Sequence, residues 1–138
     1  MVKNLLIVMA LVLGLSLTVE AAIINGGFET GDLTGWSSYG YAYVVNSYTH
    51  YSPVEGSYLL ALGTGMGTGV YSTVYQTIQL NAGDRLNGWA GFDAGDYFPD
   101  DAFVRVINAD GVLYWTPWHR SVNDVGSYGN TPWEGNVK

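Results

Sequence analysis

Short runs that alternate apolar and polar residues constrain this chain more than any other feature. The clearest run, VYSTVYQTIQL at residues 70–80, places Val70, Val74, Ile78 and Leu80 on one side and mostly tyrosine, threonine and glutamine on the other. A period of two residues predicts a half-buried β-strand, because successive side chains of a strand point to opposite faces. Aromatic and β-branched residues also favour strands over helices. We therefore predict an all-β fold.

Turn signals divide the rest of the chain into further short strands. Asp110-Gly111 lies between two β-rich runs and predicts a hairpin over residues 102–115. The NAGD sequence at residues 81–84 predicts another turn. Seven or eight short strands separated by such turns predict a β-sandwich of two antiparallel sheets, without a helix in residues 22–138. The other expected strands cover residues 39–45, 57–62 and 85–92, and one more begins at Trp133.

The composition supports one folded domain of this kind. The 138 residues include 19 Gly, 11 Tyr and 5 Trp, and only 12% of them are charged. A chain with 48% hydrophobic residues can bury a core, which argues against disorder. The chain has no Cys, so disulfide bonds cannot stabilise it.

The N-terminal residues have the pattern of an export signal. Lys3 precedes an apolar run over residues 5–17, and small residues end the segment at Ala21. We predict a signal peptide at residues 1–21 and a single domain at residues 22–138. The alternative is a retained membrane anchor, but the apolar run is shorter than the roughly 20 residues that a bilayer span needs. We therefore expect a protein that is secreted or held at the cell surface and has no stable membrane span after cleavage.

The charge balance excludes several kinds of partner. The formal net charge is −7, and only five residues are Lys or Arg. Such a chain cannot build the basic patch that tracks nucleic-acid phosphates or an anionic membrane surface. Its carboxylates leave room for a hard cation such as calcium.

Three motifs carry a resemblance to a known family. They are NGGFETGDLTGW at residues 25–36, GSYLLALG at residues 56–63 and VYSTVYQTIQLNAGDRL at residues 70–86. In this order they resemble the carbohydrate-binding-module-like, galactose-binding-like jelly-roll domains of secreted bacterial proteins, as in exported proteins with a PEP-CTERM sorting tail. The resemblance covers residues 23–133 and implies a jelly-roll β-sandwich.

The chain departs from this family at its C-terminal end. The last strand of the family, which often carries an Asp, and the apolar sorting tail have no counterpart after Trp133. We therefore expect a truncated form that lacks its final strand.

The same resemblance implies roles for three residues of the first motif. Phe28 would fill the core, and Glu29 would bind a structural calcium ion, with Asn25 or a nearby carbonyl as a further ligand. Calcium takes about six to eight oxygen ligands, which Gly-rich turns can supply. The alternative is that Glu29 only accepts hydrogen bonds from turn amides. A second candidate site is the acidic loop at residues 93–101, for which the alternative is a solvated loop without a metal.

Aromatic side chains are the candidate ligand-binding residues. Tyr114, Trp115 and Trp118 lie in and just after the second half of the predicted hairpin. Flat aromatic rings can stack on sugar rings, and polar neighbours can bind the hydroxyl groups. The alternative is that these rings form the core, which a small Cys-free sandwich also needs.

Catalysis is not predicted. The two histidines, His50 and His119, do not occur in a metal-binding spacing such as HExxH. The GTGMGTG segment at residues 63–69 lacks the strand-then-helix context of a nucleotide-binding loop. We therefore expect a non-enzymatic binding module for an extracellular polysaccharide or another surface polymer. The alternatives are a structural or adhesive surface protein that binds no sugar, and a fragment without a function of its own.

Overall fold

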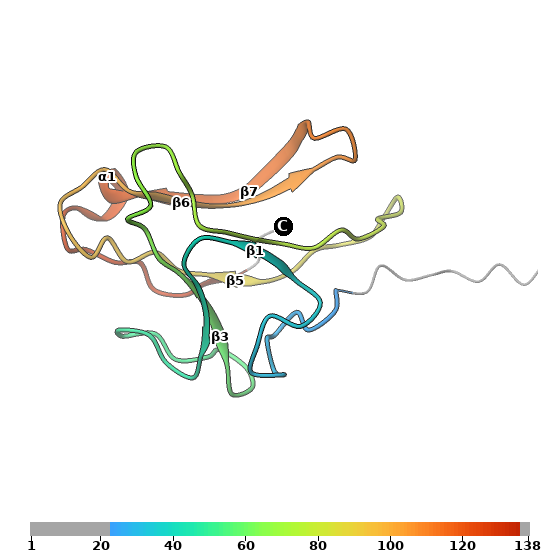
Figure 1. Ribbon diagram of the computed structural model, residues 1–138, viewed down its shortest axis with the longest axis horizontal. Helices are drawn as coiled ribbons and strands as arrows, with labels where there is room; N and C mark the ends of the chain where they lie inside the picture. The colour runs from blue at the N-terminus through green and yellow to red at the C-terminus, as the bar shows by residue number, and fades with distance from the viewer. Residues whose placement is uncertain (1–22, 136–138) are drawn as a thin grey trace, which may run out of the picture.

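The computed structural model describes residues 23–135, so the predicted signal peptide lies outside the described residues. The described part is all-β apart from one helical turn, which confirms the all-β part of the predicted fold (Figure 1). Within it, no helix is long and apolar enough to cross a membrane. The elements are β1 (Ser37–Tyr39), β2 (Ala42–Val45), β3 (Leu59–Leu62), β4 (Thr73–Tyr75), β5 (Trp89–Ala90), β6 (Asp101–Ile107), β7 (Leu113–Ser121), α1 (Val122–Val125) and β8 (Glu134–Gly135).

The strands pair two by two into antiparallel ribbons. The pairs are β1–β4, β2–β3, β5–β8 and β6–β7, and all four are two-stranded sheets. The β6–β7 ribbon runs along one side of the molecule, β3 crosses the opposite side, and β1 and β5 lie between them (Figure 1). The larger sheets of a sandwich are not formed among residues 23–135.

The predicted hairpin is confirmed and is the longest element. Gly111 adopts a left-handed backbone conformation with φ 79°. The Asn108 carboxamide oxygen accepts hydrogen bonds from the amides of Asp110 and Val112, at 3.1 and 2.8 Å. Strand β7 then continues to Ser121, well beyond the predicted range.

The prediction that residues 22–138 contain no helix is wrong for one turn. Helix α1 directly follows β7. The Asp124 carboxylate accepts hydrogen bonds from the Ser121 amide and hydroxyl, at 2.7 and 3.0 Å, and so holds the start of this turn. These contacts lower the pKa of Asp124 below its usual value.

Several predicted strands are shorter than expected or are interrupted. The alternating run at residues 70–80 forms regular pairing only over β4, and residues 85–92 only over β5. The run at residues 39–45 splits into β1 and β2 at Gly40, whose φ is 82°. Alternation thus identified the extended segments correctly, but strand pairing depends on neighbours that are distant in sequence.

Two small clusters of buried side chains form the core. The first contains Phe92, Ala94 and Trp118, and the second contains Tyr51, Leu59 and Ala61. The two clusters are joined because the buried Tyr51 hydroxyl donates to the carbonyl oxygens of Phe92 and Thr131, at 3.0 and 2.6 Å. Tyr51 also packs edge-on against Trp133, with 4.9 Å between ring centroids.

Candidate functional site

An open pocket lies beside Trp115, one of the predicted ligand-binding rings. Its volume is about 360 Å³, and Asp84, Arg85, Leu86 and Trp115 line it. The turn at residues 81–84 and the hairpin turn after β6 extend toward the same end of the molecule (Figure 1). The pocket therefore joins a loop and a strand that are about thirty positions apart in sequence.

The predicted NAGD turn positions the polar side of the pocket. The Asp84 amide donates to the Asn81 carbonyl oxygen at 3.1 Å, and the Asp84 carboxylate accepts from the Asn81 amide at 2.7 Å. Gly83 supplies the positive φ of 98° that the turn requires. Because these two hydrogen bonds join the first and last residues of the turn, they fix the backbone at Asp84 and at the following Arg85.

Strand β7 positions the aromatic side. Trp115 pairs with Val106 of β6, within a stretch where the register shifts on both sides of Val106. The Trp115 side chain is 41% exposed, so part of its ring faces solvent. Bulges commonly redirect a side chain next to a binding site.

The charged groups of the pocket remain available to a ligand. Among residues 23–135, Arg85 forms no ion pair, whereas Arg120 pairs with Glu134 at 3.0 Å. The hydrogen bonds of the Asp84 carboxylate use only its Oδ2 atom, which leaves Oδ1 as an acceptor. The pocket thus combines a flat apolar ring, a forked hydrogen-bond donor and a carboxylate acceptor.

The structure does not bring the three predicted rings together. Tyr114 is 79% exposed and lies beside Trp115 in the chain. Trp118 is only 8% exposed, packs with Phe92 and Ala94, and donates its indole N–H to Glu134. A sugar ring cannot stack on a buried indole. Trp118 is therefore a core residue, which is the alternative that the sequence left open for these rings.

Asn25 holds the opening loop of residues 25–36. Its amide nitrogen donates to Thr30 Oγ1, Asp32 O and Thr34 O at 2.7, 3.0 and 3.2 Å. Its backbone oxygen accepts from the Trp36 indole at 3.1 Å. Hydrogen bonds from the Thr34 and Thr30 hydroxyls lower the pKa of Asp32. A single carboxamide therefore organises a segment that has no regular secondary structure.

Phe28 and Glu29 take different places from those expected. The Phe28 ring is half-buried, packs on Trp36 with 5.3 Å between centroids, and lies outside both core clusters, so the predicted core plug is wrong. The Glu29 carboxylate accepts from the amides of Ser57 and Tyr58, at 2.9 and 3.2 Å. These are the amide contacts that the alternative to calcium ligation described.

No calcium site is assembled from acidic side chains among residues 23–135, where no three His, Asp or Glu residues converge. The oxygens of Thr30, Asp32 and Thr34 instead surround the Asn25 amide nitrogen. Carbonyl and hydroxyl oxygens suit calcium, but the amide donor satisfies them in this arrangement. Calcium binding by Glu29 and Asn25 stays a prediction.

The carboxylates of the acidic loop mainly serve its turns. Asp93 Oδ1 accepts from the Gly95 amide at 3.1 Å, and Asp96 Oδ1 accepts from the Phe98 amide at 2.8 Å. Asp93 Oδ2 also accepts from the Thr49 hydroxyl at 2.9 Å. These contacts agree with a loop that is shaped by its own aspartates.

Sequence reasoning missed two groups of residues. Gln76 lies within the predicted strand at residues 70–80 and was assigned no role, yet its carboxamide exchanges hydrogen bonds with the Ile24 backbone and donates to Gly35 O at 2.6 Å. Residues 84–86 were assigned to a turn and a strand, with no indication that they lie beside Trp115. No local sequence pattern marks either contact, because both depend on long-range packing.

No protein-family model, curated protein or solved structure matches this chain.

Proposed function

We propose that the chain is a secreted, non-catalytic module of jelly-roll type that binds an extracellular polysaccharide beside Trp115. The observation that carries the proposal is the pocket in which a partly exposed indole lies next to Asp84 and Arg85. Ligand pockets typically combine apolar walls with a few well-placed polar groups. The Trp115 ring offers an apolar face for a sugar ring, while Arg85 donates to sugar oxygens and Asp84 accepts from hydroxyl groups.

Secretion and the jelly-roll topology belong to the same proposal. The N-terminal pattern that ends at Ala21 supports export. Antiparallel ribbons, turn-rich connections and a nearly complete lack of helix support the jelly roll. A structural calcium ion bound by Glu29 and Asn25 is a further part of the proposal, supported by the resemblance of the opening motif and by the carboxylate and carboxamide oxygens of these two residues. A thermal melt with calcium and then with EDTA tests it, since an ion that binds only the folded state raises Tm.

Depletion of the protein from solution by insoluble polysaccharides tests the binding site. We expect Trp115→Ala to reduce binding by about tenfold or more, because the ring provides most of the apolar contact. Tyr128→Ala is the matched control, because this exposed ring lies beside the acidic loop and does not line the pocket. Equal loss in both variants, or binding that survives Trp115→Ala, would contradict the assignment.

A structural or adhesive role is the second candidate. Tyr39 and Tyr75 project from the same face of the β1–β4 ribbon and are 59% and 57% exposed. Exposed aromatic surface of this kind often marks a contact between proteins. Sedimentation analysis separates the two functions: an adhesive protein associates with itself without glycan, whereas a binding module stays monomeric until a polymer is added.

A further inference from the structure

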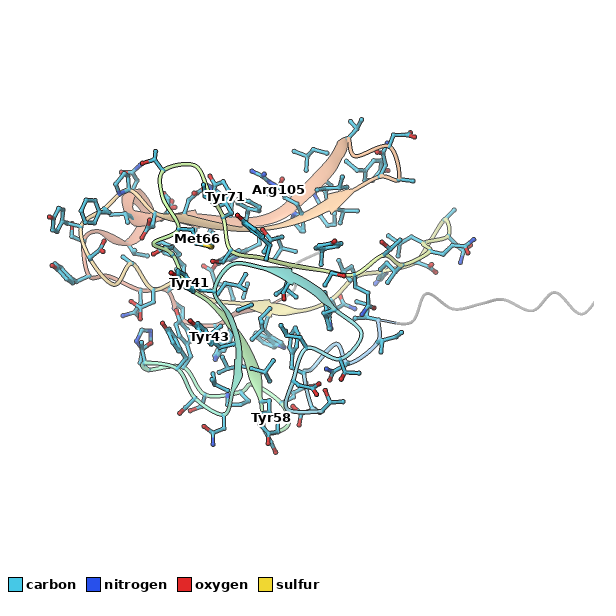
Figure 2. All side chains as sticks on the ribbon, viewed as in Figure 1. Tyr41, Tyr43, Tyr58, Met66, Tyr71 and Arg105 are labelled. Atoms are coloured by element: carbon cyan, nitrogen blue, oxygen red, sulfur yellow. The ribbon has the colours of Figure 1, made fainter. Side chains whose placement is uncertain are left out.

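The outer face of the β6–β7 ribbon carries a second group of aromatic and charged side chains. Ala102 and Val104 pack toward the core, so the alternate residues Phe103 and Arg105 face away from it. Tyr71 reaches this face from the segment before β4 and packs edge-on against Phe103, with 5.0 Å between centroids. Figure 2 shows Tyr71 and Arg105 side by side.

The Phe103 ring fixes the position of the Arg105 guanidinium. The central carbon of the guanidinium lies 3.5 Å from the ring centroid. At this distance the cation is attracted by the ring face. Stacking uses one flat side of the guanidinium and leaves its N–H groups free to donate.

Arg105 is an unpaired cation in this cluster. Within the described range, Arg120 pairs with Glu134, and His50 and His119 contact Asp93 and Asp101, whereas no carboxylate pairs with Arg105. The nearby Asp101 carboxylate is occupied on the same face, because His119 lies 3.2 Å away. A hydrogen bond to Asp101 and its charge also raise the pKa of Tyr71.

We propose that Tyr71 and Arg105 form a second binding site, which takes a carboxylate-bearing sugar of an acidic polysaccharide. Arg105 binds the sugar carboxylate through its free N–H groups, which match a carboxylate in geometry. Tyr71, which is 44% exposed, provides a flat apolar surface for the sugar ring. This site is separate from the Trp115 pocket, because Trp115 pairs with Val106 while Arg105 points to the opposite face.

The net charge of −7 does not prevent this contact. At physiological salt the Debye length is about 8 Å, so acidic groups beyond the cluster are largely screened. The fixed guanidinium interacts with the ligand carboxylate at direct contact, where screening is weakest. The negative charge of the rest of the protein instead limits non-specific attachment to polyanions.

Titration calorimetry of the full chain with polygalacturonate and with its fully methyl-esterified form tests the proposal. The ester keeps the sugar backbone and removes the charge. We expect the acid form to bind at least about tenfold more tightly than the ester through this site. Arg105→Gln should remove that difference, and Arg105→Lys should restore part of it, because lysine keeps the charge but loses the planar fork.

Arg85→Gln is the matched control, since it removes the other unpaired arginine at the Trp115 pocket. Arg85→Gln should weaken binding of neutral polysaccharide and keep the preference for the acid form. Arg105→Gln should keep the binding of neutral polysaccharide and remove that preference. Circular-dichroism melts confirm that each variant folds. Equal binding of acid and ester by the unmodified protein would overturn the proposal. A preference for the acid form that survives Arg105→Gln, or that is lost in Arg85→Gln, would also overturn it. The same holds if poly-glutamate binds as tightly as polygalacturonate.

Discussion

At the scale of single residues, two carboxamide side chains hold the opening segment of the domain, residues 24–35. Asn25 organises the opening loop, and Gln76 connects that loop to the end of β4. Both bind backbone groups that no strand pairs, and so fix the positions of these irregular segments. Hydrogen bonds from these two carboxamides therefore hold the Gly-rich opening segment.

Replacement of Gln76 by Ala should lower the free energy of unfolding by about 1–2 kcal/mol, because three backbone contacts to Ile24 and Gly35 are lost. Gln79→Ala is the control, because Gln79 has the same side chain and is exposed. Urea unfolding of both variants measures the difference. If the two substitutions cost the same, Gln76 does not connect the loop to β4.

The buried Tyr51 hydroxyl makes the free energy of unfolding depend on pH in the alkaline range. Burial raises the pKa of Tyr51 above 10.0. Because the folded state holds this proton more tightly than the unfolded state, the contribution is complete below pH 10 and is lost as pH rises through the folded pKa. We expect Tyr51→Phe to be less stable than the unmodified protein at pH 8. We also expect it to lose less stability than the unmodified protein between pH 10 and 12.

Denaturant unfolding at several pH values checks this expectation. Tyr71 has a raised pKa as well, so the unmodified protein shows both contributions, and the difference from Tyr51→Phe isolates that of Tyr51. Parallel curves for the two proteins would show that Tyr51 does not link stability to pH.

At the scale of elements, the contact between Tyr51 and Gly91 joins the segments before β3 and after β5. A Cβ atom at Gly91 would lie 2.6 Å from Tyr51 Cε1, closer than real contacts allow. Gly91 therefore permits the Tyr51 ring to approach the backbone and reach the carbonyl oxygens of Phe92 and Thr131. Close approach, and not a turn, is the reason for glycine here.

Gly91→Ala should cost about 1–3 kcal/mol, because the added methyl group displaces Tyr51. Gly88→Ala is the matched control: nothing lies within 4 Å of its added Cβ, and its effect should stay within about 0.5 kcal/mol. Thermal melts of both variants provide the measurement. A Gly91 variant as stable as the Gly88 variant would contradict this packing.

The elements also show which features could be predicted from sequence. The Asp110-Gly111 hairpin and the NAGD turn were predicted correctly, because turn dipeptides act locally through their backbone preferences. The full strands at residues 70–80 and 85–92 were not, because pairing partners are set by long-range contacts such as those of Gln76. Alternation identifies an extended segment but does not say which neighbour it pairs with.

At the scale of the whole molecule, the candidate site was only partly predictable. Trp115 was identified from its residue type, but the same argument selected Trp118, which is buried. Ring type cannot separate a binding face from a core, because an indole serves both. Arg85 and Arg105 gave no sequence signal, since an unpaired cation can be recognised only after the positions of the carboxylates are known.

The central claim is that a glycan binds against Trp115. The most direct test is a ¹H–¹⁵N NMR titration of the protein with soluble oligosaccharides, in which the indole signals of the five Trp residues are followed. We predict that the Trp115 signal shifts with ligand concentration, while the signal of Trp118, buried and bonded to Glu134, stays in place. A titration in which Trp115 does not move, either because another indole shifts or because no oligosaccharide has an effect, would contradict the claim.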